Sequence, residues 1–136
     1  MNKTMAQSPV TIVESDYDRL TELVEITRCT LPEISLYMQE ELDRAKIVTE
    51  ADPASVQMGS SVRFIDHGSG KMHNIRLVYP VDASLADGRL SVLTPVGSAL
   101  LGQQAGSTAL CRSAAGHVRP LTVVSVIPPP DARAAP

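Results

Sequence analysis

Residues 91–102 read SVLTPVGSALLG, and no other stretch of the chain is more informative. The segment leaves a strand-like run, turns at Pro95 and continues as a short apolar segment that Gly102 closes. Proline is favoured in the first turn of a helix and glycine just beyond the last turn. The pattern predicts a strand over residues 89–94 and a short helix over residues 95–101. From spacing alone, the simplest interpretation is a helix that covers a sheet.

On either side of this segment, β-branched runs broken by turn residues predict further strands. They cover residues 61–66, 71–80, 108–112 and 117–127. The sequence HGSG at 67–70 is consistent with a hairpin turn, and AAG at 114–116 predicts a second tight turn. Five strands and one short helix within residues 59–127 predict a half-wrapped antiparallel sheet.

The first helix is predicted over residues 15–27. Its apolar stripe, with spacings of three and four, consists of Tyr17, Leu20, Leu23 and Val24. Ser15 followed by Asp18 resembles a capping box with the shorter acid, and acidic residues are favourable at a helix N-terminus. These signals place the start of the helix at Ser15.

A second helix is predicted from Pro32 to about Val48. Proline is tolerated in the first turn because its missing N–H has no partner to lose there. The apolar stripe of this helix consists of Ile34, Met38, Leu42 and Ala45. Because only a few residues join the two helices, they are predicted to be antiparallel neighbours. Residues 15–52 are thus expected to form a short coiled-coil hairpin whose stripes are used in mutual packing.

The remaining segments complete the expected organisation. Residues 1–14 are predicted to be an N-terminal arm, in which 9–13 form either a short strand or an extended lead into the hairpin. Residues 53–58 are predicted to be a linker, and the proline-rich residues 128–136 a disordered tail. The chain is therefore predicted to be an α+β protein with a helical hairpin followed by a β-rich domain.

Charge is distributed unevenly along the chain. Residues 14–52 contain eleven acidic and four basic residues, a net charge of −7, whereas the rest of the chain carries +4. Such asymmetry is typical of a segment that meets a basic surface, or of helices with solvated acidic faces. Free nucleic acid is not an expected partner of the hairpin, because phosphates would repel it.

The composition also limits location and redox state. No apolar run approaches the roughly 18 residues of a membrane helix, and the first residues do not resemble a signal peptide. A cytoplasmic location without membrane contact is therefore expected. Cys29 and Cys111 lie far apart in the sequence, and in that compartment they are expected to be free thiols.

Residues that could carry chemistry are few. His67, His73 and His117 do not stand at metal-ligand spacings from each other or from a cysteine, and a structural zinc site needs about four convergent donors. The chain contains no dinucleotide fingerprint, phosphate-binding loop or nucleophile elbow. We therefore expect no enzyme activity, no cofactor and no metal site.

Three segments of the C-terminal part carry a resemblance to a known family. They read IRLVYP, LSVLTPVGSALLG and VRPLTVVSVI, and they resemble the FKBP-like domain of the bacterial Gre transcript cleavage factors. With its short hairpin and the run EELDRAKIV before that domain, the whole chain resembles the family of the regulator of nucleoside diphosphate kinase, Rnk. The resemblance covers about residues 10–127.

The resemblance implies a partner and a contact surface. It implies binding to RNA polymerase near the secondary channel, with the FKBP-like domain on the channel rim and the hairpin pointing inward. An acidic hairpin would be attracted to a basic pore that contains magnesium. The rim contact of Gre factors corresponds here to Ser91, Leu93, Thr94 and Pro95, with Val96 beside them. Leu93 stands where Gre factors have a polar or acidic residue, which implies a differently shaped contact.

The hairpin tip departs from the Gre pattern. Gre factors carry a close pair of acids at the tip that helps to hold a catalytic magnesium ion, because hard cations bind several carboxylate oxygens. The tip of this chain consists of Glu25, Arg28, Cys29, Thr30 and Glu33, with its two acids only flanking the turn. The protein is therefore expected to compete with cleavage factors at the channel without stimulating transcript cleavage.

Three other functions remain open at this point. An FKBP-type prolyl isomerase needs a pocket walled by aromatic rings, and the chain offers only one Phe and three Tyr. Direct binding to nucleoside diphosphate kinase follows from the family name, with no docking surface identified. A coiled-coil adaptor would require stripe residues such as Leu20 and Met38 to be exposed. The expected state is a monomer.

Overall fold

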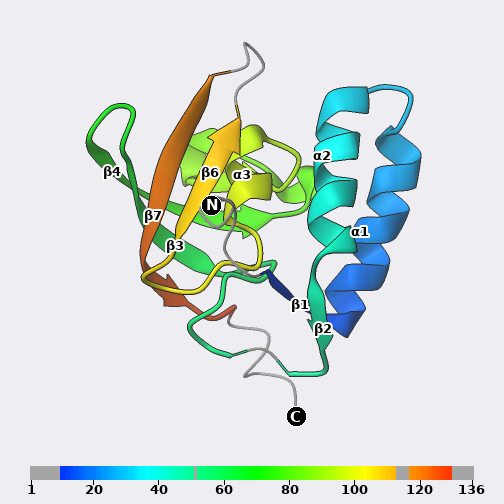
Figure 1. Cartoon of the computed structure of the whole chain (residues 1–136), viewed down its shortest axis with the longest axis horizontal. Helices are drawn as coiled ribbons and strands as arrows, with labels where there is room; N and C mark the ends of the chain where they lie inside the picture. Colours follow the sequence, from blue (N-terminus) through cyan, green and yellow to red (C-terminus); the bar gives the residue numbers. More distant parts are fainter. Residues whose placement is uncertain (1–9, 51, 113–116, 130–136) are drawn as a thin grey trace, which may run out of the picture.

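A five-stranded sheet and a pair of antiparallel helices make up most of the protein (Figure 1). The structure is a computed structural model that describes residues 10–50, 52–112 and 117–129. The turn predicted at 114–116 and most of the predicted arm and tail lie outside these residues. None of the helices in the described ranges is long and apolar enough to cross a membrane.

The helical hairpin consists of α1 (Glu14–Thr27) and α2 (Pro32–Asp43). The predicted end of the first helix is confirmed, but the predicted capping box is wrong. Val13 occupies the N-cap position and makes no side-chain cap. Negative charge in the first turn, from Glu14 and Asp16, still interacts favourably with the positive end of the helix dipole.

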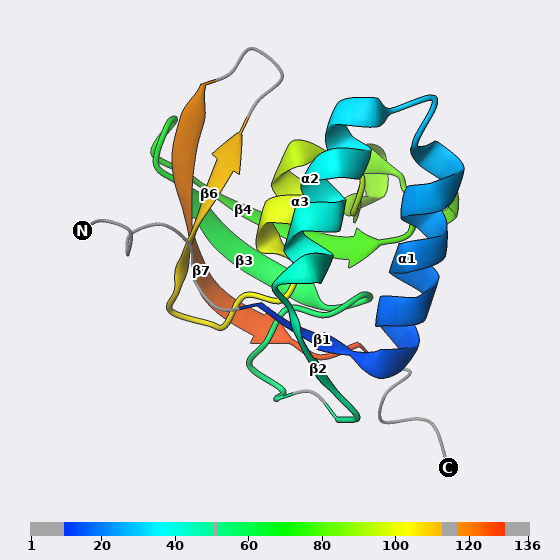
Figure 2. The same ribbon diagram turned by 45° about the vertical axis from the view of Figure 1, so that its right-hand side comes forward.

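The second helix is shorter than predicted. It ends at Asp43, and Lys46–Val48 forms a strand, β2, that pairs in parallel with β1 (Thr11–Val13). The Lys46 N–H donates to the Val10 carbonyl at 2.8 Å. Figure 2 shows β1 and β2 side by side at the base of the hairpin. Ile47 and Val48 are β-branched and therefore favoured in strands. Pairing with β1 gives this segment backbone hydrogen bonds in place of those of a longer helix.

The main sheet follows the order β5-β4-β3-β7-β6. Its strands are β3 (Ser61–Asp66), β4 (Lys71–Val78), β5 (Arg89–Ser91), β6 (Thr108–Arg112) and β7 (Val118–Ile127). The expectation of a wholly antiparallel sheet is wrong, because β5 pairs in parallel with β4. Two short 3₁₀ helices, Pro80–Asp82 and Leu85–Asp87, lie in the connection that returns the chain beside β4. These helices also explain why β4 ends before Pro80.

One hydrophobic core joins the hairpin to the sheet. The predicted stripe residues Leu20, Val24, Met38 and Leu42 are all buried, and they belong to the same cluster as Leu77 and Leu121 of the sheet. The stripes are thus shared with the sheet and not used only within the hairpin. Because Leu20 and Met38 are not exposed, the condition set for a coiled-coil adaptor is not met.

The segment expected to be a linker also contributes to this core. Val56 and Met58 are buried, and the Val56 N–H donates to the Gln103 carbonyl at 2.8 Å. If this segment were a free linker, these apolar side chains would be exposed to water. Because burying them is favourable, the segment is held against the core. The hairpin is therefore fixed to the sheet in this structure. The α3 helix (Pro95–Leu100) lies between hairpin and sheet in both ribbon views (Figures 1 and 2).

Candidate functional site

The loop before α3 is held in shape by hydrogen bonds between its own residues. The Thr94 hydroxyl donates to the Ser91 carbonyl at 2.8 Å and accepts from the Gly97 N–H at 3.0 Å. The Leu93 N–H donates to the Ser91 hydroxyl at 3.0 Å. Thr94 is therefore the N-cap of α3, a role that stabilises a helix by about 1 kcal/mol. The predicted helix start at Pro95 is confirmed, and Gly102 follows the helix with a φ of 79°.

The hairpin tip is a short turn between α1 and α2. Glu25 and Arg28 form an exposed ion pair within the last turn of α1. Cys29 is an exposed free thiol, whereas Cys111 is buried. In the described ranges, no three His, Cys, Asp or Glu side chains lie close enough together to hold a metal ion.

A groove joins the tip to the loop. Its volume is about 640 Å³, and it is lined by Thr30, Leu31, Pro32, Glu33, Ile34, Leu36, Tyr37, Glu40, Leu93, Pro95 and Arg112. The two sets of residues predicted from sequence, far apart along the chain, thus meet in one surface through Thr30, Glu33, Leu93 and Pro95.

The other predicted site residues do not line the groove. They are Glu25, Arg28, Cys29, Ser91, Thr94 and Val96. The sequence interpretation missed Leu36, Tyr37 and Arg112 in the groove. One sequence signal could have indicated Leu36, because it is an apolar residue outside the predicted stripe of α2. The structure shows that its side chain is 63% exposed. Arg112 carried no such signal, because only the sheet brings β6 beside α2.

Most of the side chains that line the groove are apolar, and Glu33, Glu40 and Arg112 add charge to the lining. Tyr37 links α2 to β6, because its hydroxyl donates to the Leu110 carbonyl of β6 at 3.1 Å. The Arg112 guanidinium lies 5.8 Å from the centre of the Tyr37 ring. Burial, followed by the nearby charge of Glu41, raises the pKa of Tyr37 to about 12. The hydroxyl therefore remains protonated, and so able to donate, at physiological pH.

Two acids counted among the charges of the hairpin are at least partly removed from water: Glu41 is buried and Asp16 is half-buried. Glu41 is only 4% exposed and pairs with Arg44, with 3.0 Å between the carboxylate oxygen and the guanidinium nitrogen. Burial raises its pKa despite the arginine. Asp16 accepts a hydrogen bond of 3.0 Å from the Tyr79 hydroxyl, and the Arg19 guanidinium lies 3.9 Å from the Tyr79 ring centre. These contacts hold α1 against the chain that follows β4.

Asp16 should make the stability of the protein depend on pH. Burial is the main cause that raises its pKa above 3.8, although the Tyr79 hydrogen bond opposes it. The folded state therefore binds this proton more tightly than the unfolded state, and the contribution of Asp16 to stability improves as the pH falls through the raised pKa. Urea titrations at several pH values measure the unfolding free energies of the wild type and of Asp16→Asn. We expect the wild-type value minus the variant value to increase as the pH is lowered. A difference that falls on acidification would contradict this.

Comparison with known proteins agrees with the sequence patterns. The family model described as "Transcription elongation factor, GreA/GreB, C-term" matches residues 50–128. The chain belongs to this GreA/GreB family. The match contains all five strands of the main sheet, α3 and the loop before it. The predicted resemblance to Gre factors is therefore confirmed.

Curated relatives of this GreA/GreB family member carry two kinds of names. The "Regulator of nucleoside diphosphate kinase" of Escherichia coli K12 is 32% identical over 106 residues, which cover 76% of this chain and 78% of the relative. A "Transcription elongation factor GreA" of Amoebophilus asiaticus is 26% identical over 106 residues, which cover 65% of that protein. The relatives named here are thus a regulator and a transcription elongation factor.

A solved structure extends this similarity to the fold. The "Prokaryotic transcription elongation factor GreA/GreB from Nitrosomonas europaea" is 33% identical, with a TM-score of 0.69. The alignment covers 89% of this chain and 99% of that chain. The mixed α+β arrangement of a helical pair followed by a curled sheet is therefore shared with this GreA/GreB protein.

Proposed function

We propose that this protein is a transcription regulator that binds RNA polymerase at the rim of the secondary channel and competes there with Gre-type factors. The groove between the hairpin tip and the Leu93–Pro95 loop is the observation that carries the proposal. It presents mainly apolar side chains, together with residues from both predicted contact regions, on one surface. The proposal includes action in the cytoplasm by a monomer.

The tip chemistry supports competition without transcript cleavage. Glu25 is engaged by Arg28, and Glu33 stands on the other side of the turn at the start of α2. A divalent magnesium ion requires several oxygen ligands in near-octahedral geometry. Two separated carboxylates, one of them in an ion pair, do not offer the close pair that the cleavage role requires.

The groove offers little support for a prolyl isomerase. Tyr37 is the one aromatic side chain among its lining residues in the described part of the chain. Small-molecule and peptide pockets that bury a proline ring are usually walled by several aromatic side chains. An FKBP-like sheet is therefore proposed here for its shape and not for isomerase activity, which a model-peptide assay would reveal.

A competition experiment tests the proposal. We expect the purified protein to be retained by immobilised core RNA polymerase at low salt and released by added Gre factor. Backtracked polymerase complexes should show no increase in transcript cleavage in its presence. No retention at low salt, or stimulated cleavage, would contradict the proposal.

A matched pair of variants tests whether the groove is the contact. Leu36→Asp places a charge in the apolar groove, where desolvation on binding is costly, and should weaken polymerase binding about tenfold or more. Ile26→Asp is the control, because Ile26 is 70% exposed on α1 and does not line the groove. Both dissociation constants are measurable by biolayer interferometry. Equal effects of the two variants would exclude the groove as the contact.

Regulation of nucleoside diphosphate kinase by direct binding is a second candidate. The observation that favours it is the 32% identity to a protein named for this role. Immobilised kinase should then retain the wild-type protein in the absence of polymerase. Retention by polymerase alone would instead favour an indirect effect on the kinase.

A further inference from the structure

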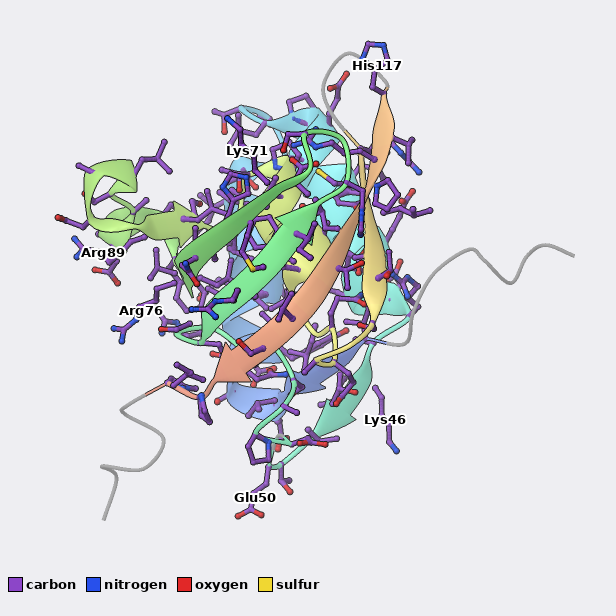
Figure 3. The ribbon with its side chains drawn as sticks, turned by 90° about the vertical axis from the view of Figure 1, so that its left-hand side faces the viewer. Lys46, Glu50, Lys71, Arg76, Arg89 and His117 are labelled. Atoms are coloured by element: carbon purple, nitrogen blue, oxygen red, sulfur yellow. The ribbon has the colours of Figure 1, made fainter. Side chains whose placement is uncertain are left out.

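The face of the sheet turned away from the hairpin carries Arg76 and Arg89, which Figure 3 labels, and Arg63 of the adjacent strand β3. In the register of the sheet, Arg89 of β5 lies opposite Arg76 of β4, and Arg76 lies opposite Ser61 of β3. Arg63 lies two residues beyond Ser61 on the same strand, and side chains alternate between the two faces. Arg63 is thus the diagonal neighbour of Arg76, at a backbone separation of about 7–8 Å.

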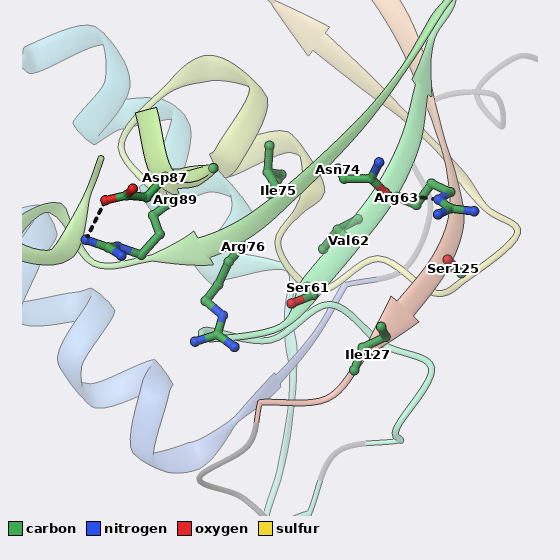
Figure 4. Close-up of a pocket in the computed structure, with 11 residues that line it drawn as sticks. Ser61, Val62, Arg63, Asn74, Ile75, Arg76, Asp87, Arg89, Ser125 and Ile127 are labelled. Carbon is green, nitrogen blue, oxygen red and sulfur yellow. Dashed lines mark hydrogen bonds and ion pairs between the residues drawn. The ribbon is translucent and has the colours of Figure 1, made fainter. Parts of the chain in front are cut away.

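These arginines surround a hollow of about 540 Å³ (Figure 4). Its lining also includes Ser61, Asn74 and Ser125, which add hydroxyl and amide donors. Arg63 donates to the Asn74 side-chain oxygen at 3.0 Å. Asp87 is the one acidic side chain that lines the hollow in the described ranges. The face is therefore rich in donors and carries excess positive charge.

The pairing of Arg76 with Arg89 is unfavourable without an anion. In this parallel pair of strands, the two like charges at paired positions repel each other, and a bound anion would reduce that repulsion. Arg89 is partly compensated, because it lies 3.6 Å from the Asp87 carboxylate and donates to the Asp82 carbonyl at 2.7 Å. Among the described residues, the Arg76 guanidinium has no hydrogen-bond or ion-pair partner, and Figure 4 draws no interaction between it and the other residues that line the hollow.

We propose that this hollow binds a small molecule that carries two or three linked phosphates. Guanidinium groups match phosphate oxygens with paired hydrogen bonds, and serine hydroxyls can donate to the same oxygens. The volume falls within the range of small-ligand sites. Arg76 and Arg89 would hold one end of the phosphate chain and Arg63 the other.

The residues around the hollow argue against single-stranded nucleic acid as the ligand. Proteins that bind it on a sheet stack its bases on exposed aromatic side chains. No aromatic residue lines the hollow in the described part of the chain, and the Phe64 ring is buried. The site is also separate from the groove at the hairpin tip, because the two share no lining residue.

Isothermal titration calorimetry with inorganic tripolyphosphate as the ligand tests the proposal. The wild type should bind the ligand, and Arg76→Gln should weaken binding at least about tenfold, because one charge-assisted interaction is lost. Lys71→Gln is the matched control, since it removes one positive charge from the far end of the same strand. Its affinity should remain within about twofold of wild type, with any general charge effect being small.

Thermal unfolding gives a second readout that does not depend on calorimetry. Without ligand, Arg76→Gln should melt at or above the wild-type temperature, because it removes the like-charge pair. Tripolyphosphate should raise the melting temperature of the wild type and of Lys71→Gln but not of Arg76→Gln.

Two results would overturn the proposal. One is the absence of tripolyphosphate binding, or equal losses in the two variants. The other is that the wild type binds no tripolyphosphate while Arg76→Gln is no longer retained by polymerase. This result would indicate that the arginine face contacts an acidic surface of a partner protein. Because Leu36→Asp alters only the hairpin groove, failure of either proposal is distinguishable from failure of the other.

Discussion

Met38→Ala should lower the free energy of unfolding by about 2–5 kcal/mol, the range observed when a large buried side chain is truncated to alanine. Met38 is 0% exposed and lies in the cluster that joins α2 to the sheet. The cavity would therefore open where the hairpin and the sheet meet. Urea denaturation followed by circular dichroism measures the change.

Met72→Ala is the matched control for this prediction. Met72 is half exposed on β4, so the same chemical change should alter the unfolding free energy by less than about 0.5 kcal/mol. Because one core spans hairpin and sheet, Met38→Ala should shift a single cooperative transition. A separate early transition for the helices, with the sheet unaffected, would contradict a single core shared by the hairpin and the sheet.

Gly97→Ala should destabilise the protein by about 1–3 kcal/mol, the usual cost of inserting an extra carbon into a tightly packed site. A Cβ atom at Gly97 would lie 2.3 Å from the Ser91 carbonyl oxygen and 2.9 Å from the Thr94 hydroxyl oxygen. These are the atoms that fix the shape of the loop before α3. The variant should therefore also weaken polymerase binding if the loop is part of the contact.

The sign of this change is informative. In an unconstrained helix, replacing glycine with alanine is favourable by about 0.5–1 kcal/mol. Gly97 does not have a positive φ, so alanine can adopt its backbone conformation without strain. Any destabilisation of Gly97→Ala would therefore come from the contacts of the new carbon. Thermal and urea unfolding of Gly97→Ala would thus show stabilisation if the loop could move away from the new carbon. Such stabilisation would contradict the tight approach that the structure describes.

Most of the elements could be predicted because their signals are local. The helical stripes depend on neighbours three and four residues apart, and the turn at residues 67–70 depends on adjacent small residues. The strand Ser61–Asp66 and the helix that starts at Pro95 are both confirmed at the predicted positions. The sequence signal of such a helix or turn is local, although its stability also depends on packing against the rest of the protein.

The misassigned segments depend on contacts between distant residues. Lys46–Val48 continues an acceptable helical pattern, yet it forms a strand because Thr11–Val13 lies beside it. The parallel pairing of β5 with β4 likewise depends on how the connecting residues fold back. Periodicity does not report whether a pairing partner exists elsewhere in the chain.

The candidate sites show the same division. Local residue patterns were enough to identify short segments that could be contact regions and to show that the hairpin tip lacks a close acidic pair. The folded arrangement was needed to show that Thr30 and Leu93 line one groove, that Glu41 is buried, and that Arg76 is paired with Arg89 in the sheet register. Helical periods and turns are fixed by neighbours in the chain, whereas grooves, buried charges and cross-strand pairs arise from sheet register and packing between residues far apart.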